Sequence, residues 1–319
     1  MRRSDHLPIE LRPVERAVVT HAHADHARPG HERYLCATAA AGAMRVRLGE
    51  IRLQTLDYGE PLVVGRARLS LHPAGHVLGS AQVSIEIDGH RTVLSGDYKL
   101  QADPTYAPFK PLRCDLFVTE STFGLPIYRW PDSATVIDEI RRWWHDNAAA
   151  GLASVIFVYA FGKAQRLLAG LAEGPGPLVC HGAVEALNRV YRAGGVTLPP
   201  TRAADDGIDR AALRRALVLA PPSAAGSPWL KRFAPYADAF ASGWMQVRGQ
   251  RRRRALDRGF VLSDHADWPA LLQAIDATGA ETLRITHGHV DVMVRWLREQ
   301  GLDAGAFETA YGEQPGDDG

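Results

Sequence analysis

Short apolar runs separated by turn residues make up most of the first third of the chain. Residues 81–87 alternate apolar and polar side chains with the two-residue period of a strand, and Asp88-Gly89 predicts a hairpin turn into a partner strand at 92–95. Further strands are expected at 17–20, 62–64, 68–72 and 116–119. Three of the strands lead into His21, Asp97 and Glu120. Functional side chains are therefore expected where strands end.

The pattern changes in the middle of the chain, where apolar strands alternate with helices. An amphipathic helix is expected at 132–150, a buried strand at 155–159 and a helix at 162–173. Strands at 178–180 and 217–220 complete a small α/β layer. Strands followed by polar loops return at 260–263 and 283–286, with helices at 268–276 and 290–300. We therefore predict an α/β protein whose two ends build one layered domain around an inserted middle segment.

Composition narrows the class of protein. Of the 319 residues, 46% are hydrophobic and 23% are charged, which excludes a mainly disordered chain. The 37 basic and 36 acidic residues give a net charge of +1, so a strongly basic tail is excluded, although a local basic groove is not. The three cysteines form no CxxC pair and are expected to be buried thiols. No signal peptide or membrane-length apolar run is visible, so we expect a soluble, cytoplasmic protein with no membrane partner.

The run from residue 21 to residue 26 is the strongest chemical signal in the sequence. His21 and His23 alternate directly after an apolar strand, so their imidazoles can project to the same side and hold one ion. Asp25 and His26 follow in the next turn, where they can face a second ion. Imidazole and carboxylate ligands suit zinc and also manganese or iron.

Two further residues are candidate ligands because of their place beside strands. His76 lies between glycines just before the strand at 81–87, and Asp97 follows the strand at 92–95. Taken alone, each is equally well explained as an ordinary loop residue. Beside the histidine run they favour metal binding, because a bridging carboxylate holds two cations ~3.5–4 Å apart.

The motifs in combination resemble a known superfamily. Those near the N-terminus, HAHADH at 21–26, GH at 75–76 and SGD at 95–97, resemble the metallo-β-lactamase superfamily. The later motifs look like its β-CASP nuclease branch: TEST at 119–122, GKAQ at 162–165, SDHAD at 263–267 and THG at 286–288. Within that branch, 220–229 and 242–245 look most like bacterial ligase-associated DNA exonucleases, which are close to mRNA 3′-end processing factor-like proteins. The resemblance covers nearly the whole chain.

The resemblance implies a fold and a role for each motif residue. The fold would be an αββα sandwich formed by 1–124 and 256–319, with an inserted α/β β-CASP cap domain at 125–255. The catalytic residues would be Asp25, His265 and Glu120, with Glu120 supporting His265. The ligands of the first metal would be His21, His23 and His76. Those of the second would be Asp25, His26 and His287, with Asp97 as the bridge.

The activity implied is that of a metal-dependent exonuclease that cleaves phosphodiester bonds of single-stranded DNA, in DNA repair. Two divalent ions, zinc or manganese, would hold a bridging hydroxide that attacks phosphorus. A DNA ligase and a helicase would act in the same pathway. The alternatives are an RNA-processing endo- or exoribonuclease of the same branch and a small-molecule metallo-hydrolase. A metal-dependent scaffold with a dead site is disfavoured because every ligand position is filled.

Candidate contacts to nucleic acid lie outside the metal motifs. Lys163 opens a helix, where main-chain N–H groups favour a phosphate, although an ordinary helix start fits equally well. Arg251 and Arg252 belong to a run of four arginines that would track phosphates or form a solvated face. Ser223 is a further candidate within the motif at 220–229. One departure from the family is the missing Asp upstream of His21, for which Asp5 is the nearest replacement.

Overall fold

The computed structural model describes residues 13–171, 173–204, 207–247 and 257–307. Its largest sheet contains strands from both ends of the chain and has the order β16-β15-β8-β7-β6-β5-β4. The strands are β4 (Pro61–Val64), β5 (Ala67–Pro73), β6 (Ala81–Ile87), β7 (His90–Leu94), β8 (Leu116–Ser121), β15 (Thr282–Gly288) and β16 (Asp303–Ala306). β4 to β7 are antiparallel, whereas β7, β8, β15 and β16 run parallel. The α/β class predicted from the sequence is confirmed.

A small parallel sheet packs on one face of this large sheet. It consists of β1 (Arg16–Val18), β2 (Arg33–Ala37) and β3 (Leu53–Leu56). Leu35 and Leu56 from the small sheet share a buried cluster with Leu69, Leu71 and Val83 from the large one. The period-2 pattern of β5 and β6 therefore has its apolar face against a second sheet.

Helices cover the outer faces of the two sheets. On the large sheet, α7 (Trp268–Thr278) and α8 (Val290–Glu299) bury Leu271 and Met293 together with Val93, Phe117 and Ile285 of the strands. The small sheet is accompanied by the 3₁₀ turn η1 (Thr38–Ala40) and by α1 (Ala41–Leu48), which shares a buried cluster with the outer face of β2. The layers are therefore helix, sheet, sheet and helices.

β2, β3 and α1 were absent from the sequence prediction. β2 is a five-residue segment that begins at Arg33, directly after Glu32, and α1 combines a glycine with two arginines, so neither carries a clear apolar period. Their stability comes from packing between the sheets and against neighbouring helices, which the local pattern does not show.

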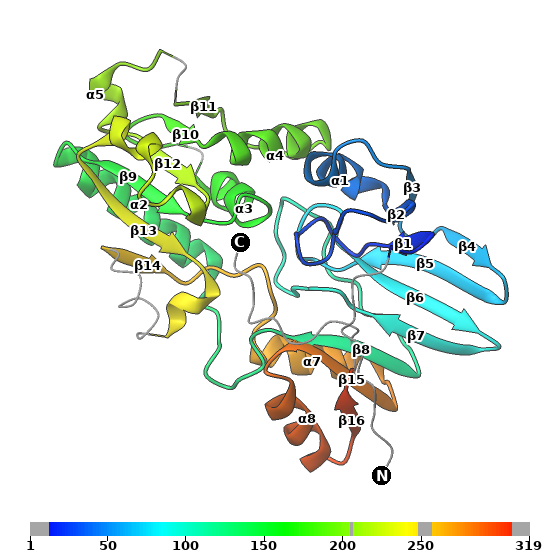
Figure 1. The fold of residues 1–319 in the computed structure, drawn as a ribbon. Coiled ribbons are helices and arrows are strands. Elements are labelled where there is room, and N and C mark those ends of the chain that lie inside the picture. The colour runs from blue at the N-terminus through cyan, green and yellow to red at the C-terminus, as the bar shows by residue number, and fades with distance from the viewer. Residues whose placement is uncertain (1–12, 172, 205–206, 248–256, 308–319) are drawn as a thin grey trace, which may run out of the picture.

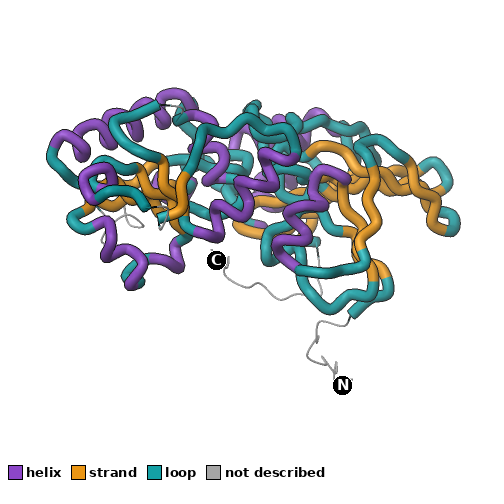
Figure 2. The backbone as a smooth tube through the Cα atoms, turned by 90° about the horizontal axis from the view of Figure 1, so that it is seen from above, coloured by secondary structure: helices purple, strands orange, loops and turns teal. Residues whose placement is uncertain are grey.

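The middle of the chain forms a separate six-stranded parallel sheet with the order β11-β10-β12-β9-β13-β14. Its strands are β9 (Ala153–Phe157), β10 (Leu178–Cys180), β11 (Arg202–Ala203), β12 (Leu217–Ala220), β13 (Tyr236–Ala241) and β14 (Arg258–Phe260). Its helices are α2 (Ser133–Ala149), α3 (Lys163–Gly170), α4 (Gly182–Ala193) and α5 (Arg210–Leu213). Two 3₁₀ turns, η2 (Pro222–Ala224) and η3 (Pro228–Phe233), lie between β12 and β13, and η4 (Gly243–Gln246) follows β13. Figure 1 shows this sheet beside the other two, and Figure 2 shows the strands gathered in two groups.

Three strands of this sheet differ from the sequence prediction, and one of them, the two-residue β11, was not predicted. β13 was not predicted, because its alanines and Asp238 give it few of the residues that favour strands, yet it pairs with β9 at the centre of the sheet. The inserted segment was predicted to end at residue 255, and β14 lies after that position. Its hydrogen bonds are nevertheless to β13, a strand of the inserted segment. The division of the chain into two domains stays a prediction.

Trp144 anchors α2 to the six-stranded sheet and offers a test of this packing. Its side chain is completely buried, and its Nε1 donates a hydrogen bond to the Arg215 carbonyl at 2.8 Å. We expect Trp144→Ala to cost ~3–5 kcal/mol of unfolding free energy, because it leaves a large cavity and an unpaired carbonyl. Urea unfolding measures the loss, with the exposed Ile127→Ala as a control expected within ~0.5 kcal/mol. An unchanged midpoint for Trp144→Ala would contradict the packing.

Among the described helices, none combines the length and the apolar character that crossing a membrane requires.

Candidate metal centre

Loops at the ends of strands from two sheets bring the histidine motifs together. The loop after β1 carries the run from His21 to His26, and the loop between β5 and β6 carries His76. Asp97 follows β7 and Glu120 lies in β8, while His265 precedes α7. A main-chain hydrogen bond from Ala81 to Thr20 at 2.8 Å joins the start of β6 to the loop after β1.

The first group of donors consists of three imidazoles and one carboxylate. One ligand atom from each of His21, His23, His76 and Asp97 lies within 4.8 Å of the others. The Nε2 atoms of His21 and His76 lie 3.4 Å and 3.8 Å from Oδ2 of Asp97. Nδ1 of His23 lies 3.1 Å from Nε2 of His76. The structure thus brings together the residues that the resemblance assigns to the first metal.

A second group shares the Asp97 carboxylate. Nε2 of His26 lies 3.4 Å from Oδ2 of Asp97 and also 3.4 Å from Oδ2 of Asp25. Asp25 and His26 form a possible ligand group together with His21. One oxygen of Asp97 therefore lies within 4 Å of imidazoles from both groups. This position suits a bridging carboxylate, and the bridging role itself stays a prediction.

The donor atoms fit divalent metal ions. Nε2 of His21 is buried and has no hydrogen-bond partner among the described residues. Burial lowers the pKa of His21 and His23, and it lowers that of His76 to about 3 although Asp264 opposes the shift. These three imidazoles are therefore neutral and their lone pairs are available, as metal ligation requires, whereas Asp97 and Asp25 outweigh burial at His26 and raise its pKa to about 9. A buried imidazole nitrogen without a hydrogen-bond partner among such neighbours is suited to bind a cation.

Hydrogen bonds from outside the two groups orient the imidazoles. The hydroxyl of Thr20 lies 3.2 Å from Nδ1 of His21 and 3.1 Å from Nδ1 of His26. Nδ1 of His76 donates to the Asp264 carbonyl at 2.8 Å, which leaves its Nε2 facing Asp97. Such contacts fix the tautomer of a ligating histidine. Asp5, the proposed replacement for the family's upstream Asp, lies outside the described residues.

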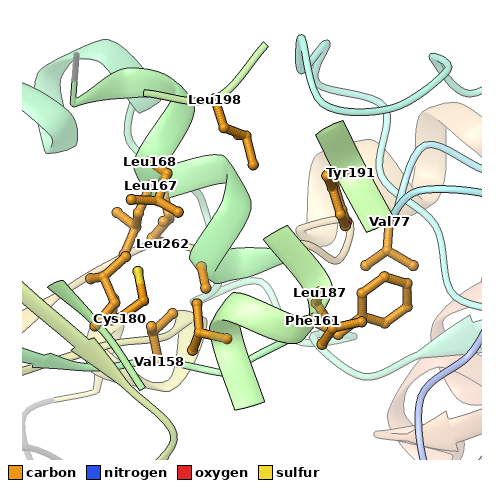
Figure 3. Close-up of a cluster of buried hydrophobic side chains, with 14 of the residues drawn as sticks. Val77, Val158, Phe161, Leu167, Leu168, Cys180, Leu187, Tyr191, Leu198 and Leu262 are labelled. Carbon is orange, nitrogen blue, oxygen red and sulfur yellow. The ribbon is translucent and has the colours of Figure 1, made fainter. Parts of the chain in front are cut away.

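The six-stranded sheet contributes one wall of the centre. The carbonyl of Phe161 lies 3.3 Å from Nε2 of His23. Figure 3 shows Phe161 and Tyr191 beside Val77, the residue that follows His76. Gly162 permits this approach, because a Cβ there would lie 2.4 Å from a methyl of Val77 and because its φ is +86°. The orientation of the His23 imidazole therefore depends on a contact across the two parts of the chain.

His265 and Glu120 form a buried pair next to the first group. Nδ1 of His265 lies 2.9 Å and 3.1 Å from the two oxygens of Glu120, whose side chain is 1% exposed. Burial alone would lower the pKa of His265, but Glu120, Asp97 and Asp264 together raise it to about 10. The imidazole therefore holds a proton on Nε2 as well as on Nδ1. The role of Glu120 as a support for His265 fits this geometry and stays a prediction.

His287 is placed differently from the other predicted ligands. Its ring centroid lies 5.6 Å from that of His26, but no group of described residues with ligand atoms within 4.8 Å includes it. The β8–β15 ladder shifts register between Thr286 and Gly288, and His287 has a φ of +54°. This strained conformation takes the exposed side chain out of the ladder, toward the second group.

The predicted contacts to nucleic acid differ in their exposure. Lys163 is 5% exposed, and its Nζ lies 3.1 Å from Oδ1 of Asp264 and 4.0 Å above the Tyr159 ring. Burial raises the pKa of Asp264, but Lys163 and the nearby imidazoles hold it below its usual range. A phosphate would have to displace this ion pair. Ser223 is exposed in η2, and Arg251 and Arg252 lie outside the described residues.

Three charged residues near His265 were not predicted as site residues from the sequence: Asp264, Lys99 and Arg166. Asp264 lies in the SDHAD motif but was assigned no role, and the residue of that motif that caps α7 is Asp267. The partners of Lys99 and Arg166 lie 164 and 97 residues away along the chain. No local pattern reveals such contacts.

Comparisons with known proteins were made for the whole chain, and no family model matches it. The chain is 35% identical over 298 residues to a probable DNA ligase from Opitutus terrae, covering 92% of this chain and 29% of that protein. It is also similar to the endoribonucleases YSH1 of Eremothecium gossypii and Saccharomyces cerevisiae. These matches have 31% and 30% identity over 124 residues, 38% of this chain and 16% of each relative. The chain thus spans less than a third of these curated relatives, which support a nuclease-related family.

One solved structure has a similar fold. It is the crystal structure of a protein of unknown function from Enterococcus faecalis V583, with a TM-score of 0.60 and 13% identity. The match covers 85% of this chain and 74% of that one. It shows that the arrangement of sheets and helices occurs in another protein.

Proposed function

We propose that the chain is a metal-dependent exonuclease that hydrolyses phosphodiester bonds of single-stranded DNA, in the β-CASP branch of the metallo-β-lactamase superfamily. The metal domain would comprise 1–124 and 256–319, and the cap 125–255. One observation carries the proposal. An imidazole whose pKa is raised by a buried carboxylate lies beside two groups of imidazoles and carboxylates that fit divalent ions.

The residues that would hold the ions follow from the two groups. The first ion would be held by His21, His23 and His76. The second would be held by Asp25 and His26, with the nearby His287. Asp97 would contact both ions. When bound, zinc or manganese supplies a nucleophile from water near neutral pH and neutralises charge on a phosphate.

The protein's own part in the reaction is the handling of protons and charge. His265 would donate the proton on Nε2 to the leaving oxygen, because Nδ1 is already held by Glu120. Glu120 keeps the imidazole charged and in one orientation, and Tyr98 N–H donates to its Oε1 at 2.8 Å. The leaving oxygen of a nucleotide is an alkoxide, which is a poor leaving group, so it departs only when it receives this proton.

DNA as the substrate is supported by the likeness to a probable DNA ligase over 92% of this chain. We accordingly propose a role in DNA repair in the cytoplasm, in a pathway with a DNA ligase and a helicase. Ser223, Arg251 and Arg252 would contact backbone phosphates, and Lys163 would do so only if its ion pair with Asp264 opens.

RNA is the alternative substrate, and a separate observation favours it. The YSH1 relatives are endoribonucleases by name, and their likeness covers 38% of the chain. Under this alternative the same residues would act on a ribonucleotide strand, in RNA processing.

A paired assay separates the two. End-labelled DNA and RNA strands of one sequence are incubated with the metal-free protein after addition of zinc or manganese. We expect DNA to be shortened stepwise from one end, with no activity before metal is added. Faster cleavage of RNA would favour the alternative. If neither strand is cleaved with either metal, the nuclease assignment is wrong. Asp97→Ala, prepared in parallel, controls for contaminating nucleases.

A further inference from the structure

Two buried cations converge on one main-chain carbonyl beside the site. The carbonyl of Ser263 accepts a hydrogen bond from Nζ of Lys99 at 2.6 Å and another from Nη1 of Arg166. Lys99 is 2% exposed and Arg166 is 6% exposed. Lys99 belongs to the segment after β7, whereas Arg166 lies in α3 beside the six-stranded sheet. The two parts of the chain therefore meet at this carbonyl.

Burying charge is costly unless the charge is paired, so such an arrangement needs a reason. The guanidinium of Arg166 is paired with Asp103 at 3.0 Å and is bonded to Gln101 and Ser133. Lys99 has no carboxylate within ion-pair distance among the described residues. Its ammonium donates a hydrogen bond to the main-chain carbonyl of Ser263 instead. Solubility and surface charge do not account for a lysine in this position.

Ser263 is the first residue of a segment that contains both Asp264, which orients His76, and His265, the proposed acid. Asp264, the next residue, gives its carbonyl to Nδ1 of His76, and His265 follows it. The N–H of Ala266 donates to the Tyr98 carbonyl at 2.7 Å, and the N–H of Tyr98 donates to Glu120. The segments 97–99 and 263–266 are thus joined at both ends of His265. The same pair of segments also positions the carboxylate of Glu120.

We propose that Lys99 and Arg166 are positioning residues for His265. By holding the Ser263 carbonyl, they fix the path of residues 263–266, and this keeps the imidazole on Glu120 with Nε2 directed to the leaving oxygen. Neither cation touches the substrate. The inference rests on the proposed function, because it assigns a task to His265, but the anchoring of the segment is measurable without turnover.

Lys99→Met is the appropriate variant because it removes the charge and keeps the length of the side chain. Arg166 is less suitable, since its loss would leave Asp103 buried without its ion pair. Arg298→Met is the matched control. It also removes a cation, in the last turn of α8, that donates to a main-chain carbonyl, that of Ala304 at 2.7 Å.

Activity is measured on a DNA strand and on a nitrophenyl phosphodiester, whose leaving group departs without a proton. We expect Lys99→Met to lower kcat on DNA ~10-fold, a part of the ~10²–10⁴ that a positioned acid contributes, with KM unchanged. The loss should nearly vanish on the nitrophenyl ester. Amide hydrogen exchange of peptides covering 262–268 should become faster, and exchange elsewhere should not. Arg298→Met should leave both readouts as in the wild-type protein.

The two readouts separate the possible failures. Equal losses on both substrates would overturn the inference, because the anchor would then serve general structure and not the acid. Unchanged exchange in 262–268 would overturn it as well. If exchange accelerates but the wild-type protein cleaves no phosphodiester with either metal, the anchoring holds. The proposed function then fails, and with it the task assigned to His265.

Discussion

Asp97→Ala is expected to abolish hydrolysis and to weaken binding of both metal ions. One oxygen of Asp97 lies within 4 Å of His21, His26 and His76, so its loss removes a donor from both groups at once. The affinity for each ion should fall by more than the ~10–100-fold that loss of an outer hydrogen-bond partner costs. Metal titration against a chromophoric chelator measures both steps, and hydrolysis of labelled DNA measures the loss of activity.

Asp25→Ala is the matched comparison for this prediction. Among the described residues, the imidazole within ion-pair distance of its carboxylate is that of His26, at 3.4 Å, and its side chain is 54% exposed. We expect it to weaken one ion and to spare the other. Asp115→Ala, a surface carboxylate 3.5 Å from His90, should change neither. If Asp97→Ala retains two tightly bound ions and near-normal turnover, Asp97 does not bridge and the two-ion centre is wrong.

Much of the large sheet was predictable because its strands carry local signals. β6 and β7 show the alternation and the Asp-Gly turn, and the structure places them as neighbours in antiparallel register. β2, β3 and β13 were missed, because their stability depends on neighbours in the fold and not on their own pattern. β14 lies on the other side of the predicted domain boundary from its partner β13, since a strand of three residues does not specify which sheet it joins.

The site shows a similar division between local and distant information. The spacing of the residues from His21 to His26 is enough to predict metal ligands there. The structure brings these residues together with His76 and Asp97. The exposed position of His287 and the ion pair of Lys163 were not foreseeable, because they depend on a register shift in β15 and on Asp264. The hydrogen bond between Lys99 and the Ser263 carbonyl joins residues 164 positions apart, so no local sequence pattern predicts it.

His265→Ala is expected to lower turnover on DNA by ~10²–10⁴-fold while leaving the metal content intact. The reason is geometric. Nδ1 of His265 is bonded to both oxygens of Glu120, and the raised pKa of the imidazole, about 10, keeps a proton available on Nε2. Metal analysis of the purified variant, combined with kcat on a labelled strand, tests both parts. An emptied metal site would make His265 a ligand, and the roles of His265 and His287 would need to be exchanged.

The leaving group decides whether the proton matters. On a nitrophenyl phosphodiester the loss caused by His265→Ala should shrink, because that group departs without a proton. Glu120→Gln should show the same trend more weakly, since it acts through the imidazole and leaves a hydrogen-bonding side chain in place. A His265→Ala variant with unchanged kcat on DNA would show that the histidine is structural. Equal losses on both substrates would show that it stabilises charge on the phosphate and donates no proton.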